Sequence, residues 1–175
     1  VRPQITCGTH ALALALMSNL RPGDELLSPV GKPYDTLEEV IGIRPSNGSL
    51  AEYGITYAQV DLLEDGGFDF DGIKAAINEK TKLVTIQRSK GYAIRKTLSA
   101  EEIGVTAKAC HEINPDVFVI VDNCYGEFCD EHEPTYYGAD MIMGSLIKNP
   151  GGGMAESGGY IAGTKRAVEL CSYRL

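Results

Sequence analysis

The stretch Val117-Phe118-Val119-Ile120-Val121-Asp122 contains the clearest predicted strand of this sequence. Its five apolar residues are mostly β-branched, which favours a β-strand. A continuously apolar strand is typical of a parallel sheet covered by helices on both faces. The run ends on a carboxylate, which is costly to remove from water without a partner. Asp122 is therefore either a turn-forming aspartate or part of a functional site.

Other stretches typical of strands lie on both sides of this one. They predict strands at residues 25–28, 55–62, 83–86, 141–143 and 159–162. Helical patterns separate them at residues 11–20, 34–41, 70–77 and 99–113, where Thr6 or Thr9 could cap the first helix and Ser99 with Glu102 forms a capping box in the last. The alternation predicts an α/β fold with three layers, helix, sheet and helix, around a mainly parallel sheet. Ligands of such folds bind at the carboxyl ends of the strands.

Composition excludes several classes of function. The 175 residues suffice for one domain with a core, and the net charge of -8 argues against a nucleic-acid partner. The apolar run at residues 11–17 is too short to span a membrane. Five cysteines at irregular spacing indicate reduced thiols and a cytoplasmic location rather than a disulfide framework. The absence of an initial methionine and of a final helix stop predicts that residues 1–175 are a segment of a longer protein.

Lys148 is the second residue of interest. In Ser145-Leu146-Ile147-Lys148-Asn149-Pro150-Gly151-Gly152-Gly153 it stands where a strand gives way to a loop, about one strand–helix–strand step after Asp122. It could pair with Asp122 or form a Schiff base, for which the amine must be at least partly deprotonated. The glycines after it would let a cofactor approach the backbone.

Two further segments complete a predicted site. In Thr6-Cys7-Gly8-Thr9-His10-Ala11 a glycine precedes a helix, where backbone N–H groups can hold an anion. In Gly31-Lys32-Pro33-Tyr34-Asp35-Thr36 an aromatic ring stands at the mouth of a loop and could stack on a flat ligand. An anion cradle, a ring platform, a carboxylate and an amine are the groups that pyridoxal 5'-phosphate would use.

The segments CGTHA, GKPYDTLEEVIG, QRSKGY, VDNCYGEF and GSLIKNPGGG resemble the aluminium-resistance or methionine gamma-lyase-like family of pyridoxal-phosphate enzymes. This family is related to the cystathionine lyases and has the aspartate-aminotransferase fold, fold type I. The resemblance implies that residues 1–175 are a cofactor-binding large domain, without an N-terminal segment and a C-terminal small domain. It also implies the roles of six residues: Lys148 as the Schiff-base lysine, Asp122 on the pyridinium nitrogen, Tyr34 on the ring, and Gly8, Thr9 and Ser145 on the phosphate.

The implied activity is that of a carbon–sulfur lyase acting on a sulfur amino acid, of the cystathionine beta-lyase or methionine gamma-lyase type, in a homodimer or homotetramer. An aminotransferase or decarboxylase, and a non-enzymatic α/β binding module, are the alternatives. The sequence departs from the lyases at Ile147, where they carry a hydroxyl, and in QRSKGY, where Gln87 or Ser89 could replace their contact to the cofactor's ring oxygen.

Two other features favour structural roles. Cys124, Cys129 and His132 lack the spacing of a zinc site, so no metal is expected. His10, at the start of the first helix, is expected to be held by local hydrogen bonds.

Overall fold

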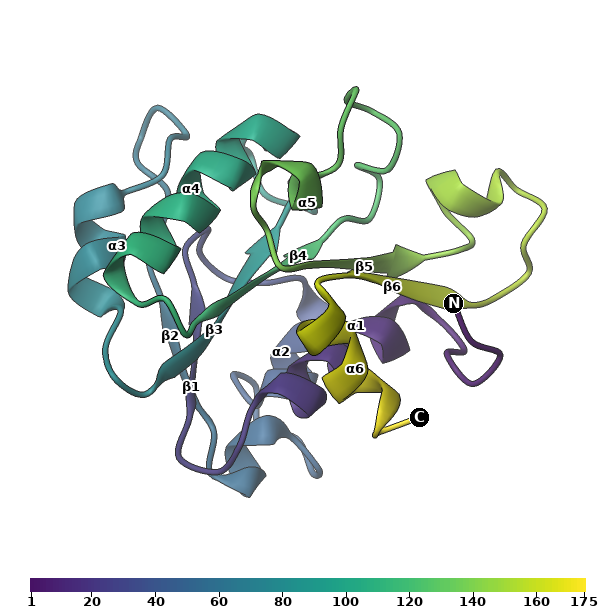
Figure 1. Cartoon of the computed structure of the whole chain (residues 1–175), viewed down its shortest axis with the longest axis horizontal. Helices are drawn as coiled ribbons and strands as arrows, with labels where there is room; N and C mark the ends of the chain where they lie inside the picture. Colours follow the sequence, from purple (N-terminus) through teal and green to yellow (C-terminus); the bar gives the residue numbers. More distant parts are fainter.

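A six-stranded sheet forms the centre of the computed structural model, which describes residues 1–175 (Figure 1). The strand order is β2-β1-β3-β4-β5-β6, and the first five strands are parallel. Only β6 runs antiparallel, against β5. The strands are β1 (Glu25–Ser28), β2 (Thr56–Gln59), β3 (Thr81–Gln87), β4 (Phe118–Asp122), β5 (Met141–Ser145) and β6 (Gly159–Gly163).

Helices cover both faces of the sheet, so the predicted three-layer α/β fold is confirmed (Figure 1). One face packs against the first, second and last helices, and the other against the three helices between. They are α1 (Gly8–Asn19), α2 (Asp35–Ile41) and α6 (Lys165–Ser172) on the first face, and α3 (Phe70–Ala76), α4 (Ala100–Ile113) and α5 (Pro134–Tyr137) on the second.

Strand β4 joins the two halves of the core. Ile120 contributes to the cluster under α1, whereas Val119 and Val121 point to the cluster under α4. These three side chains are fully buried, because β4 lies between β3 and β5 and has a helical layer on each side. The apolar sequence of the strand is thus explained by its central position.

Helix α1 is apolar on nearly all sides, and residues 11–16 are all buried. It lies against β5 and β6 and against α6, so it has little solvent-facing surface. Its N-cap is Cys7, whose Sγ accepts a hydrogen bond from the His10 amide at 3.4 Å. The prediction of Thr6 or Thr9 as the cap was wrong, because Cys7 is the residue with extended backbone before the first helical turn.

Helix α4 begins as the sequence predicts. The Ser99 hydroxyl accepts from the Glu102 amide, and the Glu102 carboxylate accepts from the Ser99 amide. Near its end, His111 contacts Asp140, which lies just before β5. Asp140 also accepts from the Val119 amide at 2.7 Å, so this contact ties α4 to two strands at the edge opposite the predicted site.

Some elements differ from the sequence prediction. Strand β2 is shorter than the predicted 55–62, because it lies at the sheet edge and pairs with β1 alone. Helices α5 and α6 and the 3₁₀ turns at Leu50–Tyr53 and Asn149–Gly151 were not predicted; all four are short. None of the helices combines the length and apolar character that a membrane crossing requires.

Gly104 of α4 provides a test of the packing between α4 and α5. A Cβ at this position would collide with the Tyr137 Cβ and lie 2.9 Å from the Tyr137 carbonyl oxygen. Alanine normally stabilises a helix by about 1 kcal/mol relative to glycine. Here we expect Gly104→Ala to lower the free energy of unfolding by about 1–3 kcal/mol, because overpacking outweighs helix propensity.

The exposed neighbour Val105 is the matched control, since Val105→Ala changes helix propensity without entering this contact. Urea denaturation of both variants tests the prediction, and a Gly104→Ala protein as stable as the wild type would contradict it.

Candidate functional site

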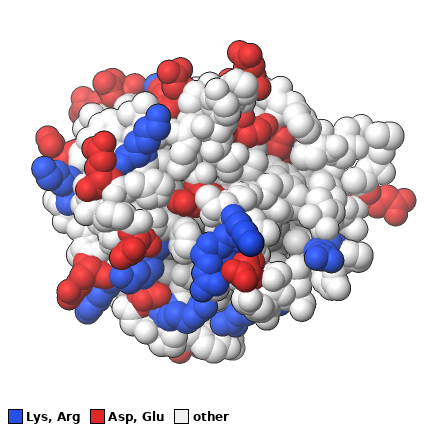
Figure 2. All heavy atoms as spheres, in the orientation of Figure 1, with Lys and Arg blue, Asp and Glu red and all other residues white.

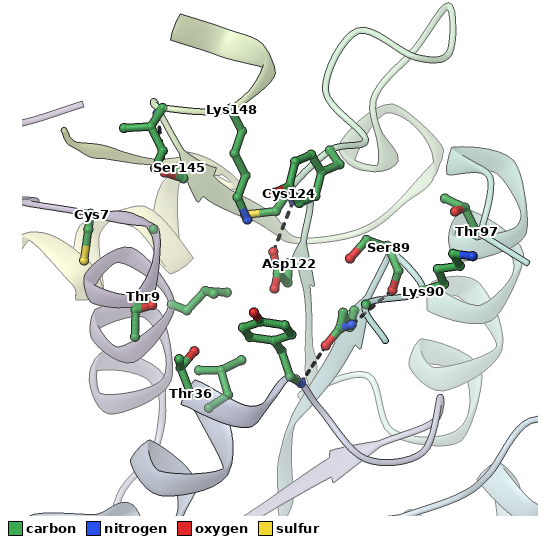
Figure 3. A pocket seen from close by; sticks show the side chains of 18 residues that line it. Cys7, Thr9, Thr36, Ser89, Lys90, Thr97, Asp122, Cys124, Ser145 and Lys148 are labelled. Carbon is green, nitrogen blue, oxygen red and sulfur yellow. Dashed lines mark hydrogen bonds between the residues drawn. The ribbon is translucent and has the colours of Figure 1, made fainter. Parts of the chain in front are cut away.

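A cavity of about 510 Å³ opens at the carboxyl ends of the parallel strands (Figure 3). Its walls come from the start of α1, the start of α2, the loop after β3, the turn after β4 and the turn after β5. This is where α/β folds bind ligands, and the volume lies in the range of small-molecule sites. All six predicted site residues line it: Gly8, Thr9, Tyr34, Asp122, Ser145 and Lys148.

Asp122 lies at the base of the cavity. It ends β4, is 7% exposed, and accepts a hydrogen bond from the Cys124 amide at 3.1 Å. Burial raises the pKa of its carboxyl, while the hydrogen bonds from Cys124 and the charge of Lys148 oppose the rise. A carboxylate so poorly solvated would be stabilised by a ligand that brings a positively charged N–H group.

Lys148 enters the same cavity from the turn after β5, with its amine on the side of Cys124 and Asp122 (Figure 3). The side chain is half-buried, and its Nζ lies 4.2 Å from the centre of the Tyr125 ring. The alternative in which Lys148 forms an ion pair with Asp122 is not observed, because the ion pairs of the chain involve other residues. Its amine is therefore not engaged by a carboxylate.

The start of α1 forms another wall. The amides of Gly8 and Thr9 are the first two of the helix, so they have no acceptor within it. A Cβ at Gly8 would lie 2.8 Å from the Ser145 Cβ, so the absence of a side chain lets α1 approach β5. His10 does not line the cavity; its Nδ1 contacts the Thr6 amide and hydroxyl, which confirms the local interpretation of this residue.

Tyr34 is fixed from two directions. Its amide donates to the Gln87 Oε1 at 2.7 Å, and its hydroxyl lies 3.1 Å from that of Tyr92, whose ring stacks on it at 5.5 Å. The hydrogen bond to Tyr92 raises the pKa of Tyr34 to about 12, so the phenol stays neutral. The Gln87 Nε2 also donates to the Ser89 carbonyl, so both the oxygen and the nitrogen of the Gln87 side chain are already hydrogen-bonded. Of the two residues that could contact the cofactor's ring oxygen, Gln87 and Ser89, Ser89 therefore has the less engaged side chain.

The turn after β4 contributes two residues that the sequence did not place at the site: Cys124, considered only as a metal ligand, and Tyr125. Cys124 lies beside Asp122 and Lys148, and burial raises the pKa of its thiol to about 12, so it is not a thiolate. Tyr125 lies under the lysine amine. The one signal in the sequence that could have identified Tyr125 is its position three residues after Asp122, in a polar turn. The other suspected metal ligands diverge: Cys129 contacts the Tyr125 carbonyl, His132 stacks on Tyr136, and no group of metal-binding side chains forms.

The comparisons with known proteins agree with this fold. The sequence matches the methionine gamma-lyase family over residues 1–175. A carbon–sulfur lyase involved in aluminium resistance from Clostridium novyi is 52% identical, with a TM-score of 0.94 over 99% of this chain and 42% of that one. A Listeria innocua protein is 53% identical, with a TM-score of 0.96 over 99% of this chain and 43% of that one. That protein is described as a provisional cystathionine beta-lyase involved in aluminium resistance.

The fold is therefore the three-layer α/β fold of these solved lyase-like structures, with the ends of its parallel strands at one cavity. The chain belongs to the methionine gamma-lyase family. The uncharacterized protein YnbB of Bacillus subtilis is 55% identical over the whole of this chain and 42% of its own length. The chain thus spans less than half of the length of these relatives.

The buried carboxylate predicts a specific dependence of stability on pH. Because the pKa of Asp122 is raised in the folded state, folding favours the neutral carboxyl. Its ionisation therefore costs stability as the pH rises above the ordinary aspartate value, and costs nothing below it. In the cofactor-free full-length protein, Asp122→Asn should increase the free energy of unfolding at pH 8 by about 1 kcal/mol or more.

The gain should shrink as the pH falls towards about 4, where aspartate is half-protonated even when unfolded. Urea denaturation at several pH values measures it, with the exposed Asp116→Asn as a control that should change little. A variant less stable than the wild type at pH 8 would show that the Asp122 charge is well compensated.

Proposed function

We propose that this chain is the cofactor-binding part of a pyridoxal-phosphate-dependent carbon–sulfur lyase that acts on a sulfur-containing amino acid. The activity would be of the cystathionine beta-lyase or methionine gamma-lyase type. One observation carries the proposal: a buried carboxylate, Asp122, and an amine without a carboxylate partner, Lys148, line one cavity at the strand ends.

The residues present fit pyridoxal phosphate in three respects. The cavity has the size of a small-molecule site. Asp122 lacks a full set of donors and would accept one from a protonated pyridine nitrogen. The first amides of α1 and the Ser145 hydroxyl face the same space and would hold a phosphate, which a helix N-terminus favours. Tyr34 would contact the flat face of the ring.

Bound in this way, pyridoxal phosphate supplies an electron sink for negative charge at the substrate's alpha carbon. The chain's own residues would do the rest. Asp122 would keep the ring nitrogen protonated, since its charge is stabilised by that proton. The Lys148 amine would hold the cofactor through the cofactor's aldehyde carbon. Once released, the same Nζ would take a proton from the substrate and later give it back.

Two alternatives remain distinguishable by experiment. An aminotransferase or decarboxylase would use the same cofactor site, because fold and cofactor do not fix the reaction. A non-enzymatic binding module would bind no pyridoxal phosphate. Incubation of the full-length protein with cystathionine, cysteine and methionine separates them, because a lyase takes up water and releases a thiol (sulfide from cysteine), a 2-oxo acid and ammonia together.

Self-association and a cytoplasmic location are part of the same proposal. The side chains of Ile147 and Met154, on either side of Lys148 in the sequence, are 55% and 88% exposed. Figure 2 shows that charged groups are sparse over the lobe formed by β5, β6 and the loop between them. Such an uncharged surface would suit a contact between two copies in a homodimer or homotetramer. The five free cysteines suit a reducing compartment.

The direct test of the proposed function is cofactor binding. Full-length protein titrated with pyridoxal phosphate should develop the visible absorbance band of the lysine-bound cofactor, and Lys148→Ala should abolish it. Lys90, the other lysine of the cavity wall, is the matched control, and Lys90→Ala should retain the band. An unchanged band in the Lys148→Ala protein would refute the assignment.

A further inference from the structure

Arg88 is the bulkiest of the side chains that are almost completely buried in this chain, and the proposed chemistry does not use it. It follows β3 directly and is 2% exposed. Its amide donates to the Asp122 carbonyl at 3.0 Å, so its backbone is already tied to the end of β4. A buried guanidinium is costly unless each of its donors finds a partner.

The partners of the guanidinium come mainly from the loop after β4. Its Nη1 donates to the Asn123 Oδ1 at 2.9 Å and to the Gly126 carbonyl at 2.7 Å, and it lies 3.5 Å from Glu133. Its Nη2 donates to the Asp130 carboxylate at 2.5 Å. The loop between Asn123 and Glu133 is thus wrapped around one fixed cation, which only a planar, forked donor set can contact at so many points.

The same loop contains unusual backbone. Tyr125 and Phe128 have φ angles of 67° and 63°, and they are the only residues other than glycine with positive φ in the chain. Side chains of this size rarely adopt such angles unless neighbouring contacts impose them. Between them, Gly126 lies so close to Arg88 that a Cβ at Gly126 would be 2.6 Å from the Arg88 Nη1. The Phe128 amide is held by Glu133 at 2.9 Å, and Glu133 also faces Arg88.

This conformation has a consequence in the cavity. The turn places the Tyr125 ring 4.2 Å from the Lys148 Nζ, where the ring face attracts the amine in its charged form. We propose that Arg88 is a positioning residue, which holds the strained turn Asn123–Phe128 so that the Tyr125 ring lies against the Lys148 amine. The inference rests on the proposed function only for the importance of that amine.

The test uses 3-fluorotyrosine at position 125 of the full-length, cofactor-free protein. Replacing Lys148 by methionine should change the fluorine chemical shift, because a cation is removed from the ring face. In an Arg88→Met background the same replacement should change the chemical shift only about half as much, or less, because the ring has moved away from the amine. Arg88→Lys keeps the charge but not the fork, so its response should be intermediate.

Two further variants secure the result. Gly126→Ala leaves every charge in place but pushes the turn away from Arg88, so it should also reduce the change in fluorine shift caused by Lys148→Met. If Arg88→Met does not fold, Gly126→Ala and Arg88→Lys together test the proposal. Arg95→Met is the matched control, because Arg95 donates to the carbonyls of Gln87, Ser89 and Lys96, and its response should equal the wild type's.

A wild-type response in both Gly126→Ala and the Arg88 variants would overturn the proposal. Because the fluorine measurement needs no cofactor, it stays decisive even if the wild-type protein fails to bind pyridoxal phosphate, which would refute the proposed function alone.

Discussion

The carboxylate of Asp122 is buried at the end of the most deeply enclosed part of the sheet, and the arrangement of the site follows from this position. Strand β4 can bring a carboxylate there only because β3 and β5 flank it and helices cover both of its faces. The cost of desolvating that charge must be offset by a cation. Lys148 supplies part of the compensating charge across the cavity, and a protonated ring would supply the rest.

The remaining walls of the cavity follow from the same geometry. Parallel strands end at one edge of the sheet, so the loops after β1, β3, β4 and β5 converge there. Gly8 lets the start of α1 approach β5, which adds free amide groups opposite the carboxylate. Beneath the visible site, the contacts of Arg88 fix the turn that carries Tyr125. The site is therefore built in two layers, one facing the cavity and one supporting it.

The sequence predicts the first layer better than the second. The apolar run before Asp122 indicates a central strand, and the glycines after Lys148 indicate a loop at a strand end, so both residues could be placed without a structure. Arg88 resembles any solvated cation in the sequence, because its burial depends on a loop that begins 35 residues later. Tyr125 was missed for a related reason: its position requires positive φ, which sequence patterns signal only through glycine or asparagine.

The most direct test of the account is a crystal structure of the full-length protein with pyridoxal phosphate. We expect electron density continuous from the Lys148 Nζ to the cofactor, the Asp122 carboxylate within hydrogen-bond distance of the ring nitrogen, and the phosphate at the first amides of α1. A cofactor joined to another lysine, or bound with its ring nitrogen away from Asp122, would contradict the claim that these two residues hold one ligand between them.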